Sequence, residues 1–213
     1  NVNSQLLNQG RDFYELWYKS QDRSCKTTYS WDKNLAGVDF FWGETNLFQV
    51  QKKQFEPVAL AIFRWLIDRL MPSDIEKEFP WIDTGILAKY YERGQEIEGD
   101  FILSWDQIEV FFNEWSCYFD VTEILELIAQ MRKRGYDRTL RAGQYLTMFI
   151  VSRSRKHGLR EDQPCITFSF GMKTGGLGMR IKIDGEETLT FPKIEFTPEI
   201  DAYLKRLEAC NIN

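Results

Sequence analysis

The stretch CITFSFGMKTGGLGMRIKI, residues 165–183, decides which kind of fold the rest of the chain builds. Its glycines crowd around Lys173 and Thr174, as in loops whose backbone N–H groups bind phosphate. On either side, however, apolar and polar residues alternate, over 165–170 and over 179–183. That alternation is typical of β-strands with one buried face. The stretch therefore predicts two strands joined by a glycine-containing loop.

A phosphate-binding loop is the alternative interpretation of these glycines. In the Walker pattern the Lys follows the last glycine and opens a helix, whereas here Lys173-Thr174 precedes Gly175-Gly176 and a strand pattern follows. The glycine spacing also differs from that of dinucleotide-binding loops, and no helix follows. We therefore predict a wide or bulged hairpin, in which the glycines supply positive φ angles.

The residues after this stretch predict a return strand and a closing helix. Asp184-Gly185 is a typical hairpin turn, and residues 188–191 are expected to form the next strand. Thr197-Pro198-Glu199 then supplies a helix N-cap, a proline for the first turn and an acidic residue near the helix N-terminus. The final helix is expected to bury one apolar face.

The N-terminal quarter combines the same two kinds of pattern. Apolar residues at helical spacing predict a helix over residues 4–20. Three strands are then expected, over residues 26–31, 38–42 and 47–52. Pro57 suits the first turn of a helix that continues to about residue 71. Because this helix has little polar face, we expect it to be buried on all sides.

The middle of the chain is predicted to be a run of helices. Ser or Asp followed three residues later by Glu or Gln marks the start of a helix, and this pattern occurs at Ser73, Ser104 and Asp120. Two further helices are expected over residues 86–93 and 139–156, because a glycine follows each of them closely.

Strands at both ends around a run of helices predict an α+β protein. We expect one domain over residues 1–213, with sub-regions 1–55, 56–160 and 161–213. The N-terminal strands and the C-terminal hairpin are expected to share one mixed or antiparallel sheet, with helices packed on it and a closing C-terminal helix. The 213 residues, 43% hydrophobic and 15% aromatic, supply enough apolar material for such a core.

Composition excludes several classes of function. No apolar run approaches the roughly 20 residues of a membrane span, and no signal peptide is visible, so a soluble cytoplasmic protein is expected. The four cysteines form no C-x-x-C pair and are expected to be reduced. With a single histidine, His157, neither a zinc site nor a histidine-based catalytic centre is predicted. No cofactor is expected, and the chain is interpreted as a protein without catalysis.

Charge is strongly segregated along the chain. Residues 66–131 contain fifteen acidic and four basic residues, whereas residues 132–160 contain nine basic residues and one acidic residue. The basic segment predicts polyanion or nucleic-acid binding as one interpretation. The other is structural, since cations favour helix C-termini and the acidic segment offers them partners. The residues concerned are Arg132, Lys133, Arg134, Arg138, Arg141, Arg153, Arg155 and Lys156.

A nuclease is the sharper form of the polyanion hypothesis. The expected order of helix, three strands and helix, with Asp39 before Gln51-Lys52-Lys53, resembles that of the restriction-endonuclease-like nucleases. The resemblance implies that Asp39 and Gln51 bind Mg²⁺ and that Lys53 positions the attacking water, with Glu15 as a further acid. The motif departs from the family pattern, because Lys52 stands where an apolar residue belongs.

Aromatic residues in the acidic region indicate a surface for a protein partner or for a second copy of the chain. Neighbouring rings such as Tyr90 and Tyr91 cannot share one helix face, so some rings are expected to be exposed. Exposed Tyr and Trp are favoured at protein interfaces. We therefore predict a non-catalytic binding or assembly protein whose docking surface contains Trp81, Tyr90, Tyr91, Trp105, Trp115 and Tyr118.

Overall fold

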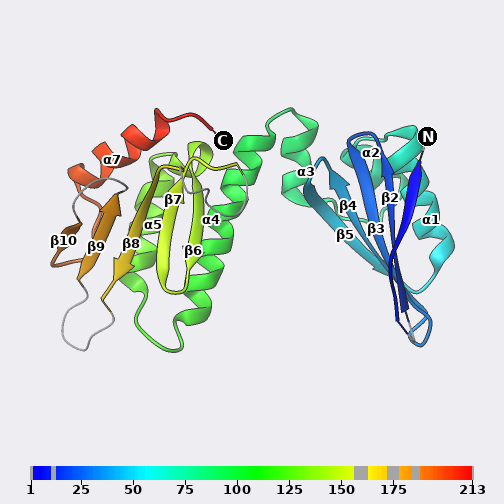
Figure 1. Ribbon diagram of the computed structural model, residues 1–213, viewed down its shortest axis with the longest axis horizontal. Helices are drawn as coiled ribbons and strands as arrows, with labels where there is room; N and C mark the ends of the chain where they lie inside the picture. The colour runs from blue at the N-terminus through cyan, green and yellow to red at the C-terminus, as the bar shows by residue number, and fades with distance from the viewer. Residues whose placement is uncertain (1, 11–12, 156–162, 172–177, 184–187, 213) are drawn as a thin grey trace. The chain divides into compact units, whose positions relative to one another are not determined.

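The computed structural model describes residues 2–10, 13–155, 163–171, 178–183 and 188–212. Contacts divide the chain into two compact units, residues 1–95 and 96–213, each built around a five-stranded antiparallel sheet (Figure 1). The α+β class is confirmed. The N-terminal and C-terminal strands, however, lie in two different sheets, so the expectation of one shared sheet is wrong. The expectation of a single domain over 1–213 stays a prediction, and each unit is described by itself.

The sheet of unit 1 is a meander in which each strand pairs with the next strand of the sequence. Its register aligns apolar side chains across the strands, so that Cys25 lies opposite Phe40 and Phe40 lies opposite Phe48. The strands are β1 (Asn3–Gln9), β2 (Phe13–Ser20), β3 (Arg23–Ser30), β4 (Leu35–Trp42) and β5 (Thr45–Lys52).

The helix predicted over residues 4–20 is wrong, because this segment forms β1 and β2. Its apolar residues fit a helical spacing, but residues 13–18 (FYELWY) are mostly aromatic, and aromatic side chains favour strands. Between the two strands, the Gly10 N–H donates to the carbonyl oxygen of Phe13 at 2.9 Å. Strand propensity and pairing with β3 therefore outweigh the spacing.

Helices cover one face of the unit 1 sheet. A π-helical segment, η1, continues directly from α1 and packs on β2 and β3, while α3 packs on β5 (Figure 1). Trp65 of η1 is fully buried and contacts the rings of Phe40 and Phe48. The helical segments are α1 (Phe55–Phe63), η1 (Arg64–Asp68), α2 (Pro72–Glu78) and α3 (Gly85–Glu92).

A buried arginine joins the sheet of unit 1 to η1. Arg23 is 1% exposed, and its guanidinium lies 4.5 Å from the ring centroid of Trp42 and 4.1 Å from that of Trp65. It donates hydrogen bonds to the carbonyl oxygens of Leu70 (2.6 Å) and Trp65 (3.3 Å). Burial, followed by the positive charge of Arg69, lowers the pKa of Arg23 to about 10. Arg23 therefore remains a cation at neutral pH and satisfies carbonyls at the end of η1.

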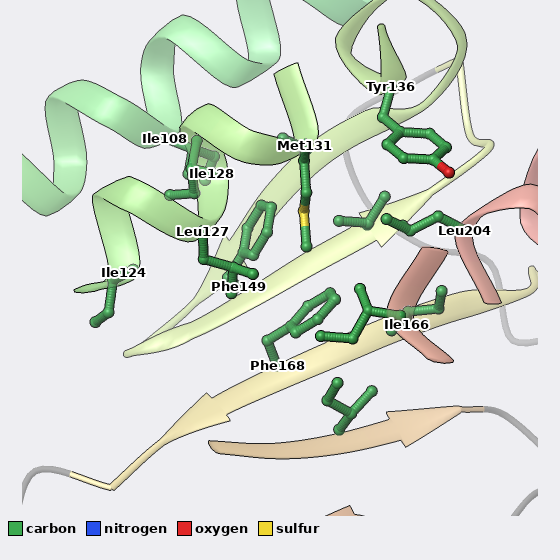
Figure 2. Packing of buried hydrophobic residues seen from close by; sticks show 14 of the residues in the cluster. Ile108, Ile124, Leu127, Ile128, Met131, Tyr136, Phe149, Ile166, Phe168 and Leu204 are labelled. Carbon is green, nitrogen blue, oxygen red and sulfur yellow. The ribbon is translucent and has the colours of Figure 1, made fainter. Parts of the chain in front are cut away.

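Unit 2 packs helices against the sheet β10-β9-β8-β7-β6. Figure 2 shows side chains from α4, α5, β7, β8 and α7 meeting in one apolar cluster. Phe149 and Phe168 pair across β7 and β8 with ring centroids 5.3 Å apart. The elements are α4 (Glu96–Trp115), α5 (Thr122–Lys133), α6 (Tyr136–Thr139), β6 (Arg141–Tyr145), β7 (Met148–Ser152), β8 (Cys165–Phe170), β9 (Met179–Ile183), β10 (Leu189–Phe191) and α7 (Pro198–Glu208).

The helix predicted over residues 139–156 is also wrong, because most of this segment forms the hairpin β6–β7. The helix start predicted at Ser104 lies in the interior of α4, where the hydroxyl of Ser104 donates to the carbonyl of Phe101. The same hydroxyl accepts from the Ala142 N–H at 2.9 Å, which ties α4 to β6. The sequence pattern around Ser104 is that of a helix start, but the serine lies inside a helix, where its hydroxyl bonds to the helix backbone and to a neighbouring strand.

The strands around the glycine-rich loop are confirmed. β8 and β9 are antiparallel, and the Gly171 N–H donates to the Gly178 carbonyl at 2.8 Å. Residues 172–177, like the predicted turn Asp184-Gly185, lie outside the described residues. A strand follows the glycines, where a phosphate-binding loop would have a helix.

Candidate protein-docking surface

The six aromatic residues predicted to form one docking surface are divided between the units. Trp81, Tyr90 and Tyr91 belong to unit 1, and Trp105, Trp115 and Tyr118 belong to unit 2. Two of the six are core residues: Tyr91, and Trp105, whose indole N–H donates to the Leu140 carbonyl at 2.8 Å. Trp81 and Tyr90 carry cations on their faces, from Lys52 at 4.3 Å and from Arg93 at 4.8 Å.

Trp115 and Tyr118 lie in a group of four rings at the C-terminal end of α4. Phe111, Trp115 and Phe119 are spaced four residues apart and therefore stack along one side of the helix and its terminal turn. Ring centroids are 5.3 Å apart for Phe111 and Trp115, and 5.1 Å for Trp115 and Phe119. Tyr118 lies 6.4 Å from Trp115, and its N–H donates to the Trp115 carbonyl at 2.9 Å.

This aromatic group is anchored in the core of unit 2. Phe112, which is buried, contacts Phe111 at 5.2 Å on one side and Phe170 at the end of β8 at 5.9 Å on the other. The core therefore fixes the position of the more exposed rings. Rings held in this way lose little conformational entropy when they bind a partner.

The β6–β7 hairpin adds two exposed side chains at the same end of unit 2. Phe149 of β7 pairs with Phe168 of β8, so the hairpin tip and the C-terminal end of β8 lie at the same end of the sheet (Figure 1). Tyr145 and Leu146 form that tip, and with Tyr118 they are 62–78% exposed. We call the six residues Phe111, Trp115, Tyr118, Phe119, Tyr145 and Leu146 the aromatic tip.

Leu146 is held in an unfavourable backbone conformation. Its φ of 53° is in the left-handed region, which costs a residue with a side chain about 1–2 kcal/mol. Tyr145 pairs with Met148, so Leu146 is the first residue of a two-residue turn, a position that often carries glycine. A large apolar side chain that is both strained and exposed is more typical of binding than of folding.

The surroundings of the aromatic tip are acidic. Glu114, Asp120 and Glu123 have exposed side chains and lie within a few residues of the rings in the sequence, which contains no Lys or Arg between residues 94 and 131. Asp120 accepts a hydrogen bond from the Thr122 N–H at 3.0 Å, and hydrogen bonding by Thr122 lowers the pKa of that carboxyl. The tip therefore presents negative charge at neutral pH.

Four of the eight residues of the predicted polyanion site pair with carboxylates of unit 2. Arg132 lies 2.8–3.3 Å from carboxylate oxygens of Asp106, Glu109 and Asp137. Three further arginines each have one acidic partner: Arg134 with Asp201 at 3.9 Å, Arg138 with Glu98 at 3.0 Å, and Arg155 with Asp100 at 3.9 Å. These contacts support the structural interpretation of the basic segment, in which its cations pair with acidic residues of the same fold.

The remaining basic residues of the segment have other surroundings. Arg141 donates to the backbone carbonyl of Arg155 at 2.7 Å, and the Nε of Arg153 is buried without a hydrogen-bond acceptor. Lys133 is exposed on the last turn of α5, as predicted for a helix-end cation. Lys156 lies outside the described residues.

The predicted nuclease residues all lie in unit 1. Asp39 of β4 faces Gln49 rather than Gln51, and Lys53 follows the end of β5. Glu15 stands on a strand, not on the expected helix, and forms an ion pair with Lys26 at 3.1 Å. The order of elements that carried the nuclease resemblance is therefore wrong. Among the described residues, no three His, Cys, Asp or Glu side chains are grouped to share a metal ion.

Comparisons with known proteins found no match to this chain, whether among family models, curated proteins or solved structures. Within the described parts of the chain, no helix has the length and apolar character needed to cross a bilayer.

Proposed function

We propose that this chain is a non-catalytic binding protein whose aromatic tip docks a cationic segment of another protein. The observation that carries the proposal is a group of core-anchored rings, of which Tyr118 and Tyr145 are exposed, with three exposed carboxylates close to it in the sequence. Trp and Tyr bury large areas at low entropic cost, which makes them frequent anchors of interfaces. The strained Leu146 supports the same function. Because its side chain is exposed, the strain is not offset by burial of that side chain within unit 2.

The charge of the tip argues for the chemistry of the partner. Arginine and lysine side chains place their cations over aromatic faces, and the three carboxylates attract the same groups over a longer range. A second aromatic tip is disfavoured as the partner, because two acidic tips repel each other. A cationic segment with interspersed apolar residues fits both the rings and the charge.

Three labelled peptides test the proposal by fluorescence polarisation against the full chain: alternating Arg-Leu, alternating Lys-Leu and alternating Glu-Leu. We expect the arginine peptide to bind best, the glutamate peptide not to bind, and affinity to fall as salt is added. The double variant Trp115→Ala, Tyr118→Ala should weaken binding by roughly tenfold or more.

Tyr90→Ala is the matched control, since it removes a surface ring from unit 1 and should leave affinity unchanged. Equal binding of the three peptides would contradict the proposal. An unchanged affinity of the double variant, with its fold intact by circular dichroism, would contradict it as well.

A further inference from the structure

One flank of the helix α1–η1 in unit 1 is apolar and uncovered. Leu60, Phe63 and Ile67 follow the spacing of a single helical stripe, and each is 46–50% exposed. This differs from the expectation of a helix buried on all sides. Arg64, one helical turn after Leu60, borders this stripe and pairs with Glu78 of α2 at 2.8 Å.

The strand β1 exposes an apolar residue on the same face of the sheet. Four directly paired residues run across the sheet from β1 to β4. Leu6 pairs with Leu16 of β2, Leu16 pairs with Thr27 of β3, and Thr27 pairs with the buried Val38 of β4. Since directly paired residues point to the same face, Leu6 is on the face that α1 and η1 cover further along the sheet. It is nevertheless 53% exposed.

β1 is also an open edge without the usual protection. It pairs with β2 on one side, and among the described residues no strand pairs with its other side. Natural edge strands are commonly protected by lysine, by proline or by a covering element. The sequence from Asn1 to Gly10 contains no charged residue and no proline, and every residue of β1 is exposed.

The opposite edge of the sheet is protected. α3 packs against β5, and the Tyr91 hydroxyl donates to the Thr45 hydroxyl at 2.6 Å. β5 also ends with Lys52, whose ammonium group lies over the ring of Trp81. β1 is therefore the edge of the unit 1 sheet that lacks these protections.

We propose that two copies of the chain associate through β1, which pairs antiparallel with the β1 of the second copy about a twofold axis. One available edge per copy makes this pairing close at two chains, whereas a filament would need both edges. Because β1 is uncharged, self-pairing brings no like charges together across the strands. Leu6 of each copy supplies apolar area on one face of the sheet, and the apolar stripe of α1–η1 lies on the side of the sheet that this face looks to. This surface is in unit 1 and is independent of the aromatic tip.

The oligomeric state of the full chain tests the proposal by sedimentation across a wide dilution series. We expect a mass of twice the 25.3 kDa chain for the natural sequence. Leu6→Lys places two lysines close to the axis and should halve the mass. Leu146→Lys is the matched control, because it changes an exposed leucine to lysine in the aromatic tip, and it should leave the dimer intact.

Hydrogen exchange of the natural chain tests the dimer without a variant, and so still applies if a substituted chain does not fold. In the dimer, amides on both sides of β1 are bonded, so residues 3–9 of the natural chain should exchange more slowly as concentration rises. Phe63→Asp, which leaves the strand unchanged, should shift the dimer to higher concentrations. A monomeric mass at every concentration overturns the proposal, and so does a dimer that Leu146→Lys dissociates while Leu6→Lys does not.

Discussion

At the scale of single residues, Arg23 shows how unit 1 accommodates a buried charge with rings and backbone carbonyls as its partners. Two indole rings cover the guanidinium, and two backbone carbonyls accept its hydrogen bonds. Each group alone is a weak partner for a cation, but together they replace part of the hydration that burial removes. Nothing in the local sequence RSCKTTYS distinguishes this arginine from a surface one, because both tryptophans come from other elements.

Replacing Arg23 should therefore destabilise unit 1 strongly. Arg23→Ala leaves a cavity between two rings and removes the donor for the Leu70 carbonyl, and we expect a loss of about 3–5 kcal/mol. Urea denaturation followed by tryptophan fluorescence measures the change. Arg93→Ala removes an arginine that lies over a surface ring and should cost less than about 1 kcal/mol. Equal effects of the two substitutions would contradict this account of Arg23.

At the scale of elements, strands of alternating pattern and helices with clear ends were predictable. The strands 38–42, 47–52, 165–170 and 179–183 and the final helix are confirmed, because their local patterns agree with the tertiary structure. The helices predicted over 4–20 and 139–156 are hairpins instead. In both segments apolar residues fit helical spacing, while aromatic and β-branched residues pair with a neighbouring strand that periodicity does not reveal.

The same error hid two of the six residues of the aromatic tip. Trp115 and Tyr118 were predicted as docking residues from composition, and the structure places both in the aromatic tip. Tyr145 and Leu146 were missed because the expected helix over 139–156 contained no turn. The alternation in residues 148–152 (MFIVS) was weak, and no glycine or asparagine marked the hairpin turn.

The turn of the hairpin β6–β7 should lower the stability of unit 2 and strengthen the binding of a partner. Leu146→Gly removes a side chain from a left-handed position and should stabilise unit 2 by roughly 0.5–1 kcal/mol, after the entropic cost of glycine. The same change should weaken binding of the arginine peptide, because the tip loses an exposed apolar contact. Thermal denaturation and the polarisation assay measure the two effects. A loss of stability would show that the positive φ carries no strain.

At the scale of the whole molecule, the chain contains two separate apolar cores. Trp65 and the aromatic residues of β4 and β5 form one, and the cluster around Phe149 and Phe168 forms the other. Each core is built within one continuous half of the sequence. Composition indicates enough apolar material for burial but not how that material is divided between cores.

The two units should unfold in two distinguishable transitions. Phe149→Ala empties a fully buried site in unit 2, and we expect a loss of about 3–5 kcal/mol in that unit alone. Arg23→Ala should shift only the transition of unit 1. Hydrogen exchange at increasing urea assigns each transition to its half of the chain. A single transition that both substitutions shift would instead support one cooperative domain over residues 1–213.

The meander of unit 1 also has a consequence during synthesis of the protein. Every strand of its sheet pairs with the strand made directly before it, and β5 ends at Lys52. The helices that cover this sheet end at Glu92, whereas the first strand of unit 2 begins at Arg141. Contacts between sequence neighbours form quickly, and N-terminal units generally fold first on the ribosome. Unit 1 therefore completes its core while the sheet of unit 2 is still being translated.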